Sequence, residues 1–510
     1  MPARLPDASA EFPRLTLDQM ERLAADLSLF ASPGMALLLE GDLGAGKSTF
    51  ARAFIRALAE GSTFDIPSPT FTLVQGYDET RVPVAHADLY RTASQQECEE
   101  LGLDDLLAQH VVLIEWPDRL DAAAWPDRAH IVISGSGAAR SVSLSAWGRC
   151  AAALKRHGAI ETFLTQNGWA SAKRRFLEGD ASFRRYETVE RDGVRAILMD
   201  MQVRPDGPPV QDGLPYSAIA HLAEDIRAVI AINTELVARG FSAPRILACD
   251  VEKGLAVIED LGRNVYGRMM LAGENMDQPL RAAVGVLAEI AGQEWPARVP
   301  VTESLFHHVP PYDLRAQLIE VDLLPSWFWP FLRNEQIPAA LHHEFTALWR
   351  GILPNAQPAR PVWTLRDYHS PNLLWLPERQ GIKRVGLIDT QDCVLGHPAY
   401  DLASLLQDAR VDIDFAVADA MFEHYCRLRG PGFDRESFAT AYAVLGAQRA
   451  TKILGIFARL AKRDGKPGYL RHMPRVARYL ARDLGHPVLK PLHAWFETHL
   501  PQVLDGSLRG

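Results

Sequence analysis

One stretch near the amino terminus, LLLEGDLGAGKSTF at residues 37–50, limits the fold of this chain more than any other. It satisfies the pattern G-x-x-x-x-G-K-S/T, with a short apolar strand before it and a helical pattern after it. Glycines let backbone N–H groups turn around a β-phosphate, and the helix N-terminus adds its positive dipole end. We therefore predict a P-loop in which Lys47 reaches the β/γ oxygens and Ser48 offers its hydroxyl to Mg²⁺. The predicted nucleotide-binding residues here are Gly41, Gly44, Gly46, Lys47, Ser48 and Thr49.

The segments around the P-loop predict an α/β domain. A helical pattern covers residues 15–31, and short apolar strands follow at 82–90, 110–116 and 129–135. Buried strands that alternate with helices imply a mainly parallel sheet covered on its faces. We expect a last strand and a short connector within residues 141–161.

Two acidic residues follow strands where a nucleotide would bind. Glu115 ends the strand VVLIE, and Asp88 lies in HADLYR after another strand. The carboxyl edge of a parallel sheet is the usual binding edge, so either acid could serve the metal. Either could equally be an ordinary surface acid.

Four motifs in this order, GDLGAGKST, IPSPTFTLVQGY, HADLYR and LIEWPDRL, resemble the TsaE family of bacterial ATPases required for tRNA threonylcarbamoyladenosine biosynthesis. The resemblance implies that Thr70 belongs to a nucleotide-sensing switch and that Asp88 serves the metal. It places Glu115, as a catalytic residue, and Trp116 at the active edge. It also implies ATP hydrolysis on a threonylcarbamoyl-transfer protein complex as partner, without direct tRNA binding. Alternatively, this half is a regulatory docking module.

A second pattern begins near residue 160. Two strands flank an Asp-Gly turn within 184–202, two more flank Gly254 within 245–262, and helical patterns dominate from 263 onward. We predict three segments: a P-loop domain at 13–148, a connector at 149–160, and a bilobal α+β protein-kinase-like domain at 161–505. Its strand-rich lobe spans 161–262 and its helical lobe 263–505.

The segment TLRDYHSPNLLW carries the predicted chemistry of this second domain. Asp367 and Asn372 reproduce the D-x-x-x-x-N spacing of a kinase catalytic loop. Asp367 would accept or orient the acceptor hydroxyl, while Asn372 and the strand-end Asp389 would bind Mg²⁺. We interpret Asp401 as structural, capping the helix that starts there.

The order of GDASFRRYETV, VIEDLG, RDYHSPNLLW and GLIDTQDCVLGHPAYDLASLLQDAR resembles the aminoglycoside phosphotransferase and choline kinase superfamily. More narrowly, with PPYDLRAQLIEVDLLPSWF, it is similar to anomeric kinases of N-acetylmuramate and N-acetylglucosamine. This narrower resemblance implies ATP-dependent phosphorylation of an amino sugar during peptidoglycan recycling. An aminoglycoside-type or other small-molecule phosphotransferase is the alternative.

Two departures from a kinase pattern limit the assignment of nucleotide contacts. Leu365 stands where kinases have the histidine of H-R-D, and the strand at 194–202 contains no lysine. Metal together with one of three arginines would then neutralise the phosphates. Those arginines are Arg184, Arg185 and Arg195. Gly179 and Ser182 would form the turn over the phosphates, and Glu259 lies where adenine would meet the backbone.

The acceptor site is predicted in the helical stretch before the catalytic loop. Tyr312, Asp313, Glu320 and Trp327 offer hydrogen bonds and stacking to a sugar. Alternatively, Trp327 and its aromatic neighbours are core of the helical lobe.

Bulk properties exclude some classes of protein. The formal net charge of −9 argues against a protein that binds nucleic acid through bulk electrostatics, although residues 173–187 are locally rich in arginine. The five cysteines (98, 150, 249, 393 and 426) form no C-x-x-C pair, which indicates a reducing compartment. The amino terminus lacks the apolar core of a signal peptide, and no run reaches the length of a membrane span. We expect a cytoplasmic protein without membrane contact.

Overall fold

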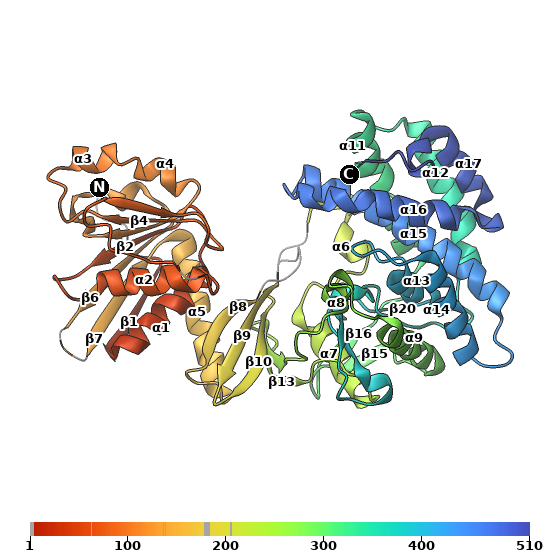
Figure 1. The fold of residues 1–510 in the computed structure, drawn as a ribbon, viewed down its shortest axis with the longest axis horizontal. Coiled ribbons are helices and arrows are strands. Elements are labelled where there is room, and N and C mark those ends of the chain that lie inside the picture. Colours follow the sequence, from red (N-terminus) through yellow and green to blue (C-terminus); the bar gives the residue numbers. More distant parts are fainter. Residues whose placement is uncertain are drawn as a thin grey trace. The chain divides into compact units, whose positions relative to one another are not determined.

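The computed structural model describes residues 5–62, 64–135, 137, 139–177, 184–203 and 207–509. The chain divides into two compact units, Met1–Asp200 and Met201–Gly510, coloured along the sequence in Figure 1. The grouping places residues 173–200 with the first unit, although the sequence assigned them to the second domain. The boundary at 149–160 stays a prediction.

The first unit contains a seven-stranded sheet in the order β1-β7-β6-β2-β5-β4-β3. Its strands are β1 (Ala8–Leu15), β2 (Ala36–Glu40), β3 (Val74–Tyr77), β4 (Val84–Asp88), β5 (Val111–Glu115), β6 (Arg128–Ser134) and β7 (Arg140–Ala146). The pairs among β4, β5, β2 and β6 are parallel. The pairs of β1, β7 and β3 with their neighbours are antiparallel. The expectation of a mainly parallel sheet is therefore right for the four central strands and wrong for both edges.

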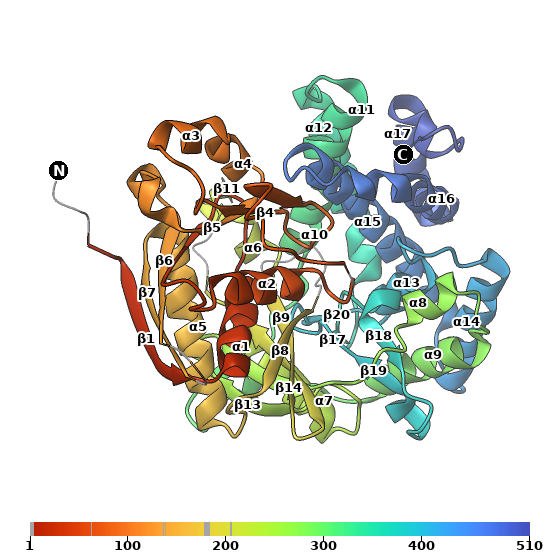
Figure 2. The same cartoon turned by 60° about the vertical axis from the view of Figure 1, so that its left-hand side comes forward.

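Alternating side chains of the central strands bury both faces of this sheet. Leu37 and Leu39 lie in the core on one face, while Ala36 and Leu38 lie in the core on the other. The first face is covered by α1 (Leu17–Ser28), α2 (Lys47–Leu58) and α5 (Gly148–Gln166), and the second by α3 (Gln95–Glu100) and α4 (Leu103–Leu107). Figures 1 and 2 show this layering. The P-loop follows Glu40, the last residue of β2, and therefore lies at the carboxyl edge of the sheet.

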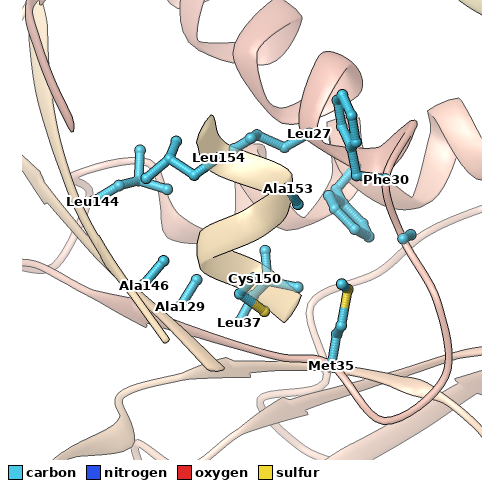
Figure 3. Close-up of a pocket in the computed structure, with 12 residues that line it drawn as sticks. Leu27, Phe30, Met35, Leu37, Ala129, Leu144, Ala146, Cys150, Ala153 and Leu154 are labelled. Carbon is cyan, nitrogen blue, oxygen red and sulfur yellow. The ribbon is translucent and has the colours of Figure 1, made fainter. Parts of the chain in front are cut away.

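The segment predicted as a short connector is instead the long helix α5. It runs for 19 residues and buries Cys150, Leu154, Ile160 and Phe163. The first two belong to the core that α1 and α2 share with the sheet, and they line a small apolar cavity there (Figure 3). Burial of its apolar side chains stabilises a helix where we expected a short connector.

Three further strands complete the first unit: β8 (Lys173–Leu177), β9 (Arg185–Arg191) and β10 (Val194–Asp200). The Asp-Gly turn between β9 and β10 is confirmed, with positive φ at Asp192 and Gly193. A buried ion network attaches these strands to α5. Arg174 of β8 donates to Glu187 (2.8 Å) and Glu161 (3.1 Å).

The second unit is mainly helical. Its helices are α6 (Tyr216–Ile219), α7 (Ile226–Ala238), α8 (Tyr266–Leu271), α9 (Asp277–Gly292), α10 (Leu314–Val321), α11 (Trp329–Arg333), α12 (Ala339–Ile352), α13 (Ala399–Leu406), α14 (Phe415–Leu428), α15 (Arg435–Lys462), α16 (Met473–Leu484) and α17 (Lys490–His499). Its strands are β11 (Pro209–Gln211), β12 (Leu214–Pro215), β13 (Ile246–Asp250), β14 (Leu255–Glu259), β15 (Arg298–Pro300), β16 (Phe306–His308), β17 (Val362–Thr364), β18 (Leu373–Trp375), β19 (Val385–Leu387) and β20 (Val394–Gly396).

Short antiparallel pairs position the catalytic segment of this unit. Strand β17 pairs with β20, and β18 pairs with β19. The loop 365–372 therefore leaves β17 and enters β18, while the loop 388–393 leaves β19 and enters β20. Within the described residues, no helix has the length and apolarity that a bilayer crossing requires.

Candidate active sites

The P-loop of the first unit depends on glycine at the point where the chain leaves β2. Gly41, Gly44 and Gly46 all have φ between +79° and +146°. A Cβ placed on Gly41 would lie 2.2 Å from the carbonyl oxygen of Ile133. Only glycine fits this approach of two backbones, so the packing of the loop against β6 requires glycine at position 41.

Lys47, the first residue of α2, is buried at the mouth of this loop. Its Nζ donates to the carbonyl oxygens of Gly41 (2.6 Å) and Asp42 (3.0 Å). It also lies 3.6 Å from the ring centroid of Trp116. Burial lowers the pKa of Lys47, and the nearby carboxylates of Glu115 and Asp88 oppose that shift. A partly desolvated cation of this kind attracts phosphate oxygens strongly.

Ser48 and Glu115 meet beside Lys47. The Ser48 hydroxyl donates to Oε2 of Glu115 (2.8 Å), and Oε1 of Glu115 lies 3.0 Å from Nε2 of His86. His86 projects from β4 and Glu115 from the adjacent parallel strand β5, where Asp88 and Glu115 are register partners. A hydroxyl and carboxylate oxygens gathered at one point suit the hard-oxygen preference of Mg²⁺.

Asp88 holds the segment predicted as a switch. The hydroxyl of Thr70 donates to Oδ2 of Asp88 (2.8 Å) and lies 2.9 Å from the hydroxyl of Ser68. The other oxygen of Asp88 accepts from the backbone N–H of Tyr90 (3.0 Å). Thr49 is half-buried in the first turn of α2. The structure thus brings Thr70 to Asp88, while its response to nucleotide stays a prediction.

In the second unit, the predicted base and both predicted metal ligands lie together. The side-chain nitrogen of Asn372 donates to the carbonyl oxygen of Asp367 (3.1 Å) and lies 3.5 Å from Oδ2 of Asp389. Asp367 keeps 40% of its side chain exposed, and Oδ1 of Asp389 accepts from Gln391 (3.0 Å). Amide and carboxylate oxygens at this spacing suit Mg²⁺. Burial raises the pKa of Asp367, but nearby positive charges, Lys452 and Arg366 among them, outweigh it and hold that pKa below its usual value.

Asp401 is structural, but its predicted role as a helix cap is wrong. The helix α13 begins after Pro398, and Asp401 lies inside its first turn. Its two carboxylate oxygens accept from the backbone N–H groups of Leu365 (2.6 Å) and Arg366 (2.9 Å). The side chain is directed at the catalytic loop rather than at its own helix terminus because those loop N–H groups have no strand partner.

A second buried carboxylate supports the other end of the same loop. Asp408 accepts from the backbone N–H of Ser370 (2.7 Å) through one oxygen and from that of Arg410 (2.7 Å) through the other. Arg410 donates to Nε2 of His369 (2.9 Å). Burial and the Arg410 charge lower the pKa of His369.

Two of the predicted acceptor residues lie inside a buried network. Glu320 of α10 is fully buried, pairs with Arg366 of the catalytic loop, and accepts from Lys452 (2.8 Å). Although burial opposes it, the charges of Lys452 and Arg366 lower the pKa of Glu320 to about 2. The Tyr312 hydroxyl also donates to Glu320, and Gln448 donates to it (2.9 Å). Direct contact of Tyr312 and Glu320 with a sugar stays a prediction.

The other two predicted acceptor residues have local roles. Asp313 caps α10, accepting from the backbone N–H of Ala316 (2.8 Å). Trp327 lies in a π-helical turn, Leu324–Phe328, and packs partly buried against the core of the second unit. This placement favours the alternative in which Trp327 belongs to the core, and sugar contact by either residue stays a prediction.

Among the predicted nucleotide contacts of the kinase-like domain, Glu259 and Arg185 have protein partners in the structure. The side chain of Glu259 binds Arg245 and Arg379, each at 3.0 Å. Arg185 donates to the carbonyl oxygen of Leu29 (2.7 Å) in the first unit and stacks on Phe30. Gly179 and Ser182 lie outside the described residues. The roles of Arg184 and Arg195 in neutralising phosphate charge stay predictions.

Sequence reasoning missed His86, His369 and Asp408. His86 lies in the quoted motif HADLYR and His369 in RDYHSPNLLW, but neither pattern shows which nitrogen faces a carboxylate. Asp408 follows α13 by two residues and has no local signal. Only long-range contacts reveal it, because Ser370 is 38 residues away in sequence.

Comparison with known proteins matches both halves of the chain. The family model "Threonylcarbamoyl adenosine biosynthesis protein TsaE" matches residues 15–142, and the model "Phosphotransferase enzyme family" matches residues 173–440. The N-acetylmuramate/N-acetylglucosamine kinase of Caulobacter vibrioides is 38% identical over 356 residues, covering 68% of this chain and 97% of that protein. The TsaE protein of Bacillus subtilis is 40% identical over 121 residues, covering 24% of this chain and 74% of that protein. The solved structure of Bacillus subtilis YdiB is 29% identical, with a TM-score of 0.26, and covers 30% of this chain and 96% of that one.

Proposed function

Because the chain belongs to the TsaE family over residues 15–142 and to the phosphotransferase enzyme family over residues 173–440, we propose that it is a bifunctional enzyme. Its first activity is ATP hydrolysis that supports threonylcarbamoyladenosine modification of tRNA. Its second is ATP-dependent phosphorylation of the anomeric hydroxyl of N-acetylmuramate or N-acetylglucosamine, in peptidoglycan recycling.

The ATPase proposal is supported by the cluster around Lys47. The partly desolvated Lys47 donates to the carbonyl oxygen of Gly41 at the end of β2, and the neighbouring Ser48 hydroxyl donates to the carboxylate of Glu115. Mg²⁺, when bound, would be held by Ser48 with Asp88 and neutralise phosphate charge. Glu115 would orient the attacking water. The partner of this half is the threonylcarbamoyl-transfer protein complex.

The kinase proposal is carried by one observation: Asp367, Asn372 and Asp389 meet at the ends of two short antiparallel strand pairs. This part of the chain is 38% identical to an N-acetylmuramate/N-acetylglucosamine kinase over 97% of that kinase. Asp367 would accept the proton of the acceptor hydroxyl, and Asn372 with Asp389 would hold Mg²⁺. Phosphoryl transfer passes through a loose transition state, so positioning and charge neutralisation supply most of the catalysis.

The test is the position of the phosphate on the product. An anomeric phosphate leaves no reducing end and is hydrolysed by mild acid, whereas a 6-phosphate keeps the reducing end and resists mild acid. We expect the product from N-acetylmuramate to fail a reducing-sugar assay and to release phosphate on brief acid treatment. An acid-stable, reducing product would contradict anomeric transfer, and phosphorylation of aminoglycosides in place of N-acetylated amino sugars would contradict the substrate class.

A further inference from the structure

A histidine in the kinase-like loop holds a fixed donor beside the proposed general base. His369 lies two residues after Asp367 and is 6% exposed. Its Nε2 lies 2.9 Å from Nη1 of Arg410. Because a guanidinium carries donors and no acceptor, Nε2 must accept in this pair. The proton of the neutral ring therefore lies on Nδ1.

Asp408 and Arg410 fix the orientation of the His369 ring. Asp408 accepts from the backbone N–H groups of Ser370 and Arg410, both at 2.7 Å. The same buried carboxylate thus holds the residue after His369 and the arginine that binds its ring. With Nε2 committed to Arg410, Nδ1 is directed at the side of the loop that carries Asp367.

The Nδ1 donor lies close to Asp367 without bonding to it. Its distance to Oδ1 of Asp367 is 4.0 Å, and among the described residues it has no hydrogen-bond partner. Buried donors are nearly always paired, and one that is not calls for an explanation. Catalytic hydrogen bonds are often long in a free enzyme and shorten in the reacting complex.

We propose that His369 is a positioning residue for phosphoryl transfer: in the complex with both substrates, its Nδ1–H donates to Oδ1 of Asp367 and leaves Oδ2 to accept the proton of the acceptor hydroxyl. In that step the hydroxyl oxygen bonds to the γ-phosphorus of ATP, the bond to the bridging oxygen breaks, and ADP leaves with the electron pair. The hydrogen bond prevents rotation of the carboxylate away from the acceptor. This inference rests on the proposed kinase function of the second unit.

Two substitutions separate this role from a merely structural one. The amide nitrogen of asparagine can occupy the place of Nδ1, so His369→Asn keeps a donor toward Asp367 and loses the contact with Arg410. The longer glutamine reaches the place of Nε2, so His369→Gln keeps an acceptor for Arg410 and loses the donor toward Asp367. If the ring only supports the loop through Arg410, glutamine should be the better replacement.

The experiment measures transfer of labelled phosphate from ATP to the sugar by the full chain, with kcat and KM determined separately. We expect His369→Gln to lower kcat about 10–100-fold, the effect of losing a hydrogen bond to a charged group, with the KM for ATP nearly unchanged. His369→Asn should keep kcat within about threefold of the unsubstituted protein. Equal losses in both variants, or a smaller loss with glutamine, would overturn the proposal.

A double substitution tests whether His369 acts through Asp367, and a wider panel of acceptors tests the proposed substrate. In an Asp367→Asn background, adding His369→Gln should cost less than about twofold, because the two residues act as one unit. A full additional loss would overturn the proposal. If His369→Gln does not fold, high kcat in folded His369→Asn supports the proposal and low kcat overturns it. If the unsubstituted protein phosphorylates no amino sugar, the proposed substrate is wrong, and the same variants are compared on the acceptor that it does phosphorylate.

Discussion

The loops of the two phosphoryl-transfer sites are shaped by different means. In the P-loop, Lys47 donates to carbonyl oxygens five and six residues away. In the kinase-like loop, the side chain of Arg366 pairs with Glu320, which is 46 residues away. The backbone N–H of Arg366 donates to the carboxylate of Asp401. In the first site the loop turns at its own glycines, while Ser48 and the backbone of Gly41 lie against residues on distant strands. The second loop has positive φ at Arg366, a non-glycine residue, and buried carboxylates that are distant in sequence hold it in place.

This comparison predicts that a substitution in one site abolishes only the activity of that site. The largest expected effect is at Lys47. Lys47→Ala should lower ATP hydrolysis by the first unit about 10³-fold or more, because the β/γ charge loses its cation. Sugar phosphorylation by the same protein should be nearly unchanged. The control is Lys155→Ala, an exposed lysine on α5 of the same unit. Loss of both activities in a folded Lys47→Ala protein would contradict two independent enzymes.

In the second site, Asp367→Asn keeps the shape of the side chain and removes the acceptor for the hydroxyl proton. We expect kcat for sugar phosphorylation to fall about 10²–10⁴-fold, the usual range for a general base. ATP hydrolysis by the first unit should stay at its original rate. Single-turnover measurement of phosphate transfer would show whether the chemical step is the one that slows.

A metal ligand should behave differently from a base in the same loop system. Asp389→Asn should raise the Mg²⁺ concentration for half-maximal sugar phosphorylation about tenfold, because a carboxylate ligand is weakened. Titration of Mg²⁺ with Asp367→Asn is the matched comparison, and there the midpoint should shift by less than about twofold. Equal shifts in both variants would contradict the division of roles between the two aspartates.

The smallest effect concerns the support behind the loop. Burial raises the pKa of Asp401 to about 7 from an ordinary value of 3.8. A group whose pKa is higher in the folded state contributes stability that is complete below the unfolded pKa and is lost as pH rises through the folded pKa. Between pH 6 and pH 8, the second unit should therefore lose about 1 kcal/mol more stability than its Asp401→Asn variant loses. Urea unfolding at both pH values measures this difference, with the exposed Glu252→Gln as control.

The sequence predictions were correct where an element has a local sequence pattern and missed elements that depend on packing. The P-loop, α1, the strands β2, β4, β5 and β6, and the hairpins around Asp192 and Gly254 are confirmed, because each has a local pattern of glycines or apolar spacing. The strands β1 and β3 and the helix α5 were missed. Their polar residues face solvent on one side, and only packing against the sheet stabilises them.

The sequence by itself indicated the two fold classes and predicted residues that would bind phosphate. A glycine loop or a D-x-x-x-x-N spacing is short, and its chemistry depends on residue types that nothing else can replace. Tertiary structure alone decided what each of these residues contacts. Asp401 turned toward the catalytic loop instead of its own helix end, Glu320 became the buried partner of Arg366, and Asp408 oriented His369 through Arg410. The physical reason is that a buried charge or N–H group must find a partner wherever the fold brings one close, and sequence spacing does not record that distance.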